Sequence, residues 1–232
     1  YVNRLVTRHE DVIPLTISDL ALFDSVDDAD ISFTAATGTL TDTLSLLPDT
    51  ELHVWATTTF TPGGTVTLNS GGTGNAYDGS LHIGDAATFT GAGTTTYYVG
   101  GSITLETGAT YMPASTTIQM TATTSGKTIT VQTGETLTVN ELQFVGAGGA
   151  WNINGDIGAT ADVLVTTGTV TGTGDITLSN GSFSGNGLVS LGGGLVTIDK
   201  SNTLGGTQGW TFNDLTLGNG SVVGTTTPGS NA

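Results

Sequence analysis

A short pattern of apolar residues recurs at intervals of about 22 residues in the second part of the chain. Three close copies of this pattern start at Ser80, Ser102 and Thr128. In each copy, apolar residues stand one, three and nine positions after the start, and a small residue stands six positions after it. Looser copies follow, and they start at Ala150, Asp175, Leu195 and Asp214. The spacing of this repeat, more than any single motif, limits the folds that are open to the chain.

The first two apolar residues of each copy are separated by one polar residue, as in a strand that buries one face. Leu81 and Ile83 form such a pair, and so do Ile103 and Leu105. One unit of this length cannot enclose a core, whereas stacked units can, because each strand pairs with its counterparts above and below. The repeat therefore predicts an all-β fold, a right-handed parallel β-helix (β-solenoid) with rungs of about 20–25 residues.

An antiparallel β-sandwich is the alternative, with each unit folded as a hairpin. Asn-Gly pairs, which are strong hairpin signals, begin at Asn154, Asn180, Asn186 and Asn219. In a solenoid, the same pairs would lie at tight corners that need a left-handed backbone. The three close copies lack a good Asn-Gly turn between strands that could pair, and this favours coils over hairpins.

The composition agrees with a β fold and excludes several classes of protein. The chain holds 48 Thr and 36 Gly, which are unfavourable in helices, whereas Thr suits strands and could form outward ladders along a stack. The formal net charge is −16, and four basic residues cannot form the cationic face that nucleic acid requires. Cysteine is absent from the sequence, and no apolar run approaches the roughly 20 residues of a membrane-spanning helix. We expect neither a nucleic-acid partner nor insertion into a membrane.

Residues 80–223 resemble the Gly/Thr/Asn-rich parallel β-helix repeats of bacterial surface proteins, such as autotransporter passengers and filamentous-haemagglutinin-like adhesins. They also resemble the repeats of β-helical phage tail fibres. The residues that carry the resemblance are the apolar pairs, each followed by a small residue, from Leu81 to Leu217. The resemblance implies a β-solenoid with a structural or adhesive role, and its motif carries no catalytic residues to transfer.

The first part of the chain has a different composition from the rest. Residues 1–51 hold 10 of the 20 acidic residues but a single glycine, Gly38. We predict that residues 1–51 form an acidic N-terminal β element, a cap or an assembly strand. Residues 52–232 are predicted to form the Thr/Gly-rich solenoid body.

Four acidic residues of the first part, Asp24, Asp27, Asp28 and Asp30, are the candidate metal ligands. Carboxylate oxygens that lie close together suit Ca²⁺, although the spacing is not that of an EF-hand. The alternative is a solvated acidic turn without a metal. The three histidines, His9, His53 and His82, show no spacing typical of a zinc site, so the sequence predicts none. Apart from a possible Ca²⁺, no cofactor is expected.

A polysaccharide-active enzyme is one alternative function, because parallel β-helices include lyases and hydrolases. A glycosidase needs two carboxylates at a suitable separation, and Asp156, Asp162 and Asp175 could be proposed. All three fit turn positions equally well, and both arginines lie within the first eight residues, away from the repeats. The sequence therefore predicts no catalytic residues and no enzyme.

The aromatic residues raise a second alternative, a module that binds surface glycans or a receptor, as in an adhesin or a phage fibre. An exposed groove lined by Tyr97, Tyr98, Tyr111 or Trp210 would favour it. For the tryptophans, core packing is the more economical interpretation, since Trp151 falls at an inward position of its repeat.

Taken together, these patterns predict a non-catalytic extracellular structural protein, a subunit of a surface filament, sheath or layer. Its main partner would be further copies of itself, because both ends of a solenoid expose unpaired strand edges. Surface glycans are a further expected partner. The expected location is extracellular or at the cell surface, with a virion as the alternative.

Overall fold

The computed structural model describes one continuous run of strands along the chain. Backbone and side chains are described for residues 44–46, 48, 50–72, 78–90, 95–111, 115–200 and 203–218. The backbone alone is described for residues 5–7, 15–17, 20–22, 29–33, 37–40, 112, 202 and 226–228. This described part contains strands and turns but no helix.

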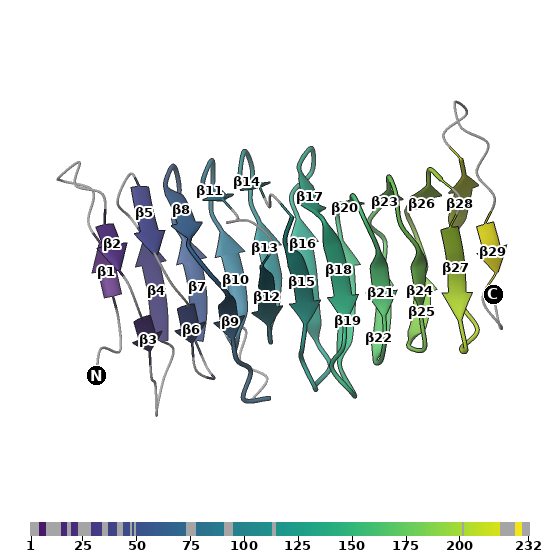
Figure 1. Cartoon of the computed structure of the whole chain (residues 1–232), viewed down its shortest axis with the longest axis horizontal. Coiled ribbons are helices and arrows are strands. Elements are labelled where there is room, and N and C mark those ends of the chain that lie inside the picture. The colour runs from purple at the N-terminus through teal and green to yellow at the C-terminus, as the bar shows by residue number, and fades with distance from the viewer. Residues whose placement is uncertain are drawn as a thin grey trace.

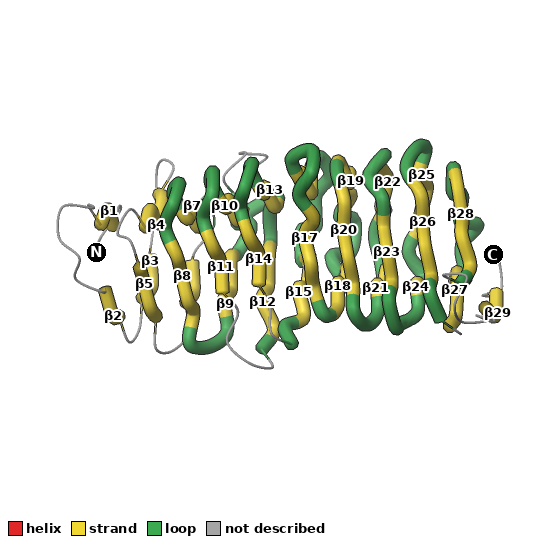
Figure 2. The backbone as a smooth tube through the Cα atoms, turned by 90° about the horizontal axis from the view of Figure 1, so that it is seen from above, coloured by secondary structure: helices red, strands yellow, loops and turns green. Residues whose placement is uncertain are grey.

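The strands form a parallel β-solenoid in which each coil contributes three strands, one to each face (Figures 1 and 2). The first face is a nine-stranded sheet of β1 (Leu5–Thr7), β4 (Ala29–Phe33), β7 (Thr50–Val54), β10 (Ser80–Ile83), β13 (Ile103–Leu105), β16 (Lys127–Val131), β19 (Ala150–Asn154), β22 (Thr169–Gly172) and β25 (Leu188–Leu191). The N- and C-terminal strands lie at opposite ends of the stack (Figure 1).

The other two faces repeat this arrangement. The second face consists of two five-stranded sheets that meet where β14 contacts β17. Its strands are β2 (Leu15–Ile17), β5 (Thr37–Leu40), β8 (Thr59–Pro62), β11 (Thr88–Thr90), β14 (Thr110–Met112), β17 (Thr136–Val139), β20 (Asp156–Ala159), β23 (Ile176–Leu178), β26 (Leu195–Ile198) and β28 (Asp214–Leu217). The third face comprises β3 (Leu20–Leu22), β6 (Leu44–Leu46), β9 (Val66–Leu68), β12 (Thr96–Val99), β15 (Thr117–Met120), β18 (Glu141–Phe144), β21 (Val163–Val165), β24 (Phe183–Gly185), β27 (Asn202–Gly206) and β29 (Thr226–Pro228).

Every strand pairing among the described residues is parallel and joins successive coils, so the antiparallel sandwich is wrong and the parallel solenoid is confirmed. The acidic and Gly-rich parts of the chain share this stack, because β7 contains residue 51 and pairs with both β4 and β10. The division at residue 51 stays a prediction about composition and role.

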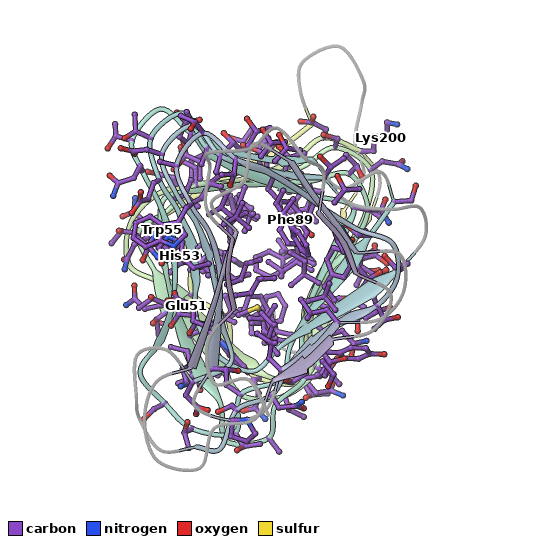
Figure 3. The ribbon with its side chains drawn as sticks, turned by 90° about the vertical axis from the view of Figure 1, so that its left-hand side faces the viewer. Glu51, His53, Trp55, Phe89 and Lys200 are labelled. Carbon is purple, nitrogen blue, oxygen red and sulfur yellow. The ribbon has the colours of Figure 1, made fainter. Side chains whose placement is uncertain are left out.

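The core is a set of ladders in which apolar side chains stack from coil to coil. On the first face, Leu81 pairs with Leu52 and Ile103, and all three are buried. Aromatic rings fill the space between the faces: Phe89 packs against Phe60 and Tyr111 at centroid distances of 5.5 and 5.4 Å. Figure 3 shows Phe89 inside the stack. Each such side chain stabilises the fold by about 1.5–3 kcal/mol through its removal from water.

Threonine ladders cover the outside, as the sequence predicted. Thr104 pairs with Thr130 on the first face, and Thr177 pairs with Thr197 on the second. Trp151 and Trp210 are buried in the core, which confirms packing as their role.

The looser copies of the repeat have the right period, but three of the four lie on a different face from the close copies. The copy at Ala150 lies on the first face, in β19, whereas those at Asp175, Leu195 and Asp214 lead into β23, β26 and β28 on the second face. The apolar-polar-apolar pattern occurs on all three faces of a coil. Pattern matching alone therefore could not tell which face a copy belongs to.

The Asn-Gly corners were only partly predicted correctly. Gly155, after Asn154, has a φ of +117°. Gly181, after Asn180, is not left-handed; instead, a Cβ there would come within 2.1 Å of the carbonyl oxygen of Ala161 in the preceding coil. Gly187, after Asn186, also lacks a left-handed φ, and Asn219 lies outside the described residues.

The turn between the first and second faces is left-handed at the same place in four coils. Thr57, Ala86, Gly108 and Gly134 have φ values of 61°, 52°, 69° and 91°. Residues with a Cβ are strained in this region by about 1–2 kcal/mol, so two of the four coils carry a residue that does not suit its turn.

Replacing Ala86 by Gly should therefore stabilise the fold. The substitution relieves the backbone strain but adds about 0.5–1 kcal/mol of unfolded-state entropy, because glycine is more flexible. Since the strain is the larger of the two, we expect the free energy of unfolding, measured with denaturant, to rise by roughly 0.5–1 kcal/mol. The matched control is Ala87→Gly at the buried neighbour, whose φ is not left-handed; it should destabilise the fold by roughly 1–2 kcal/mol. Equal losses for both variants would contradict the strain.

One ion pair is buried inside the stack. Asp78 precedes β10, and its Oδ2 lies 3.8 Å from Nζ of Lys127 at the start of β16, with both side chains buried. The backbone N–H groups of Gly71 and Gly72 donate to the same carboxylate at 2.7 and 2.9 Å, and the Ser70 hydroxyl donates as well. Lys127 is thus an inward-facing strand residue.

Asp78→Ala should destabilise the protein by about 3–5 kcal/mol, because it leaves the buried Lys127 charge uncompensated. The control is Asp175→Ala, which removes an exposed carboxylate that accepts one backbone N–H, from Leu195. Urea unfolding of both variants makes the comparison. A loss for Asp78→Ala no larger than for Asp175→Ala would contradict a structural role for the buried pair.

Candidate functional site

A cluster of charged and aromatic side chains stands on the outer side of the first face, over β7, β10 and β13. Leu52 and Val54 of β7 point into the core, so the alternation of a strand turns Glu51 and His53 outward. His82 of β10 is the register partner of His53, which brings these two histidines together across 29 positions of sequence. Figure 3 shows Glu51, His53 and Trp55 along one outer face of the stack.

Three rings of this cluster stack on one another. The imidazole of His53 lies 4.3 Å from the Trp55 ring on one side and 4.1 Å from the His82 ring on the other. The interplanar angles are 10° and 9°. Trp55 remains 42% exposed, so its outer surface is open to solvent.

Two carboxylates flank the outer imidazole of this stack. Oε1 of Glu106 lies 2.8 Å from Nε2 of His82, while Oε1 of Glu51 lies 3.6 Å from Nδ1. A carboxylate can only accept, so Nε2 of His82 donates its proton to Glu106. The other Glu106 oxygen accepts the backbone N–H of Asp85 at 3.0 Å, which holds the carboxylate in place. In neutral His82, the lone pair is therefore on Nδ1, beside Glu51.

The two histidines differ in their pKa. Burial, together with repulsion from His82, lowers the pKa of His53. Burial alone would also lower the pKa of His82, but the negative charges of Glu51 and Glu106 and the hydrogen bond to Glu106 outweigh that effect and raise it. The stabilisation from His82 is therefore complete below its ordinary pKa of about 6.5 and is lost as pH rises through its folded-state pKa. The stabilisation from His53 is complete above about pH 6.5, and it is lost as pH falls through the folded-state pKa of His53.

Glu51, His53 and His82 form a group that could hold a metal ion, and the sequence did not predict it. One potential ligand atom from each of the three lies within 4.8 Å of the others. Of the predicted calcium ligands, Asp24, Asp27 and Asp28 lie outside the described residues. Asp30 is described only in its backbone, in β4, where it is the register partner of Glu51.

The sequence contained a signal for this cluster that motif spacing missed. A further copy of the repeat starts at Glu51, with Leu52, Val54 and Phe60 at the apolar offsets. His53 and His82 then stand at the same offset of neighbouring copies, and equal offsets stack in a solenoid. A search for short motifs such as His-x-His compares residues within one strand, and so it overlooks ligands from stacked strands.

The other candidate residues are not gathered into a site by the described structure. Oδ1 of Asp162 accepts the N–H of Ser182 at 2.6 Å, and Oδ1 of Asp175 accepts that of Leu195 at 2.7 Å, so both link successive coils. Asp156 is exposed and lines a shallow groove with Gln132 and Asn154.

The aromatic residues that would favour a glycan-binding module do not line an exposed groove together. Tyr97, Tyr111 and Trp210 are buried in the core, because each lies at an inward position of its coil. Tyr98 follows Tyr97 in β12, at an outward position, and is partly exposed. Trp55 is instead the exposed tryptophan of the described residues.

In comparisons with known proteins, no family model, curated protein or solved structure matches the chain. The described residues hold no helix with the length and hydropathy of a membrane span. The function must therefore be inferred from the solenoid and from this cluster.

Glu106→Gln should lower the pKa of His82, since it removes a negative charge and a charge-assisted hydrogen bond from Nε2. An NMR titration of the imidazole protons in chelator-treated protein measures this directly. Glu135→Gln is the control, because Glu135 accepts the N–H of Gly108 in the same way without contacting His82. An unchanged His82 pKa in Glu106→Gln would contradict the assigned proton on Nε2.

Proposed function

We propose that the chain is a non-catalytic structural protein whose solenoids associate end to end into a surface filament, sheath or layer. The observation that carries the proposal lies at β28, the last strand of the second face. Leu215 and Leu217 are register partners of Val196 and Ile198, which are buried in the core. Yet Leu215 and Leu217 are 40% and 48% exposed.

These two leucines occupy core positions, and among the described residues no further strand of this sheet stacks on them. Within the described part of the chain, β28 is the edge strand of its sheet, and an edge strand presents backbone donors and acceptors for a further strand. A second copy placed against this end would supply both apolar contacts and backbone hydrogen bonds. Its partner surface would be the opposite end of the stack, which makes the contact head-to-tail and therefore open to polymerisation.

The regular exterior supports a structural role. Outward positions carry ladders of threonine, and side chains such as those of Gln119 and Gln143 bond to each other between coils. Such ladders stiffen a stack without creating a cavity for a substrate. The proposed location, extracellular or at the cell surface with a virion as the alternative, follows from the resemblance to the repeats of bacterial surface proteins, adhesins and phage fibres.

Adhesion to a glycan is a second candidate, favoured by one observation. Trp55 exposes a flat ring that is held in place by His53, as a sugar-stacking platform requires. A glycan array with the wild type and Trp55→Ala tests it. Binding that disappears in Trp55→Ala would support adhesion, and an array without hits would remove this candidate.

Replacing Leu215 and Leu217 together by Asp should weaken self-association at least tenfold, because charges would then enter the proposed apolar contact. Light scattering after size exclusion and negative-stain microscopy over a concentration series measure the effect. Leu188→Asp is the matched control, since Leu188 is 41% exposed but faces outward on β25.

A wild-type protein that stays monomeric and well folded at high concentration would falsify the assembly proposal. Association that is lost in Leu188→Asp but kept in the double variant would instead show lateral packing, and would overturn the end-to-end geometry.

A further inference from the structure

We propose that Glu51, His53 and His82 bind one divalent transition-metal ion of the zinc class on the outer side of the first face. The proposal is independent of the assembly proposed above. Its basis is a set of three ligating side chains from two successive coils, brought together by the pairing of β7 with β10.

The donor atoms select the class of metal. Two imidazole nitrogens and one carboxylate oxygen suit zinc and its neighbours in the first transition row, whereas Ca²⁺ and Mg²⁺ prefer oxygen ligands alone. Zn²⁺ sites with two histidines and one glutamate leave a fourth position for water. The same donor set with open positions also suits iron(II), so the identity within this class is decided by the test.

The distances need only a small adjustment. Ligand atoms of a tetrahedral zinc site lie roughly 3.3 Å apart, given bond lengths of about 2.0–2.2 Å. Here the three ligand atoms lie within 4.8 Å of one another, and Oε1 of Glu51 is 3.6 Å from Nδ1 of His82. The imidazole rings of His53 and His82 are stacked and nearly parallel. To direct one nitrogen of each ring at the same ion, the two rings must rotate away from this parallel arrangement.

The charge of Glu51 supplies the second argument. This residue is 7% exposed, and the 3.6 Å separation from Nδ1 of His82 exceeds an ordinary hydrogen bond. A cation between these two atoms would compensate a carboxylate that burial has removed from water.

Glu106 acts as a positioning residue for the proposed site. It accepts the Nε2 proton of His82 and is itself held by the N–H of Asp85, so it directs the Nδ1 lone pair toward Glu51. Metal-binding histidines commonly have such a carboxylate on their other nitrogen, and its loss lowers metal affinity about 10–100-fold.

The first experiment measures Zn²⁺ binding to the chelator-treated full chain by equilibrium dialysis and calorimetry. We expect one ion per chain and a raised melting temperature, because the ion joins two coils. Glu51→Gln, His53→Gln and His82→Gln should each weaken binding more than about tenfold, and Glu106→Gln by about 10–100-fold. Glu135→Gln and Asp156→Asn, which change carboxylates outside the cluster, should bind as the wild type does. Binding of no Zn²⁺ to the wild type, or equal binding to all variants, would overturn the proposal.

A second experiment uses only the wild type and so does not depend on the folding of variants. Zn²⁺ should shift the NMR signals of the His53 and His82 imidazoles and of the Trp55 indole, since the ring stack must open. The buried Trp151 and Trp210 indoles are internal controls and should not shift. Co²⁺ should give the intense visible absorption of a tetrahedral site. Shifts confined to other residues would place the metal elsewhere and overturn the assignment.

Discussion

Parallel backbone pairing between successive coils is the interaction on which the rest of this structure depends. A strand inside a sheet, such as β10, bonds to the strand one coil before it and to the strand one coil after it. The pairing holds residues at equal offsets directly above one another, coil after coil. The apolar ladders of the core and the threonine ladders of the surface are both consequences of that register.

The same close stacking explains part of the glycine content. At Gly146, a Cβ would lie 1.7 Å from the carbonyl oxygen of Ala122 in the preceding coil. Glycine is needed there because two backbones approach each other, not because the chain turns. Glycine in this chain thus meets two separate physical demands, left-handed turns and close backbone contacts, which composition cannot distinguish.

Stacking also creates chemistry that no single coil contains. Most outward positions hold small neutral residues that only continue a ladder, but around β7 and β10 they hold acids, imidazoles and an indole. His53 and His82 belong to different repeats, yet their rings lie 4.1 Å apart. A solenoid therefore gathers functional groups by repeat offset, and its candidate sites are found by comparing copies of the repeat.

The sequence by itself determined the all-β class, the stacking period and the outward threonine ladders, because these follow from alternation and propensity within one coil. It also placed Trp151 in the core. Only the tertiary structure decided the face to which each copy belongs, the burial of Tyr97 and Tyr111, the Asp78–Lys127 pair and the Glu51–His53–His82 cluster. Those features depend on which residues of separate coils come into register, and coil lengths here vary, with 29 positions from His53 to His82 but 22 from Leu81 to Ile103. A local pattern constrains the residues of one strand. The lengths of the turns between strands decide which residues of successive coils lie in register.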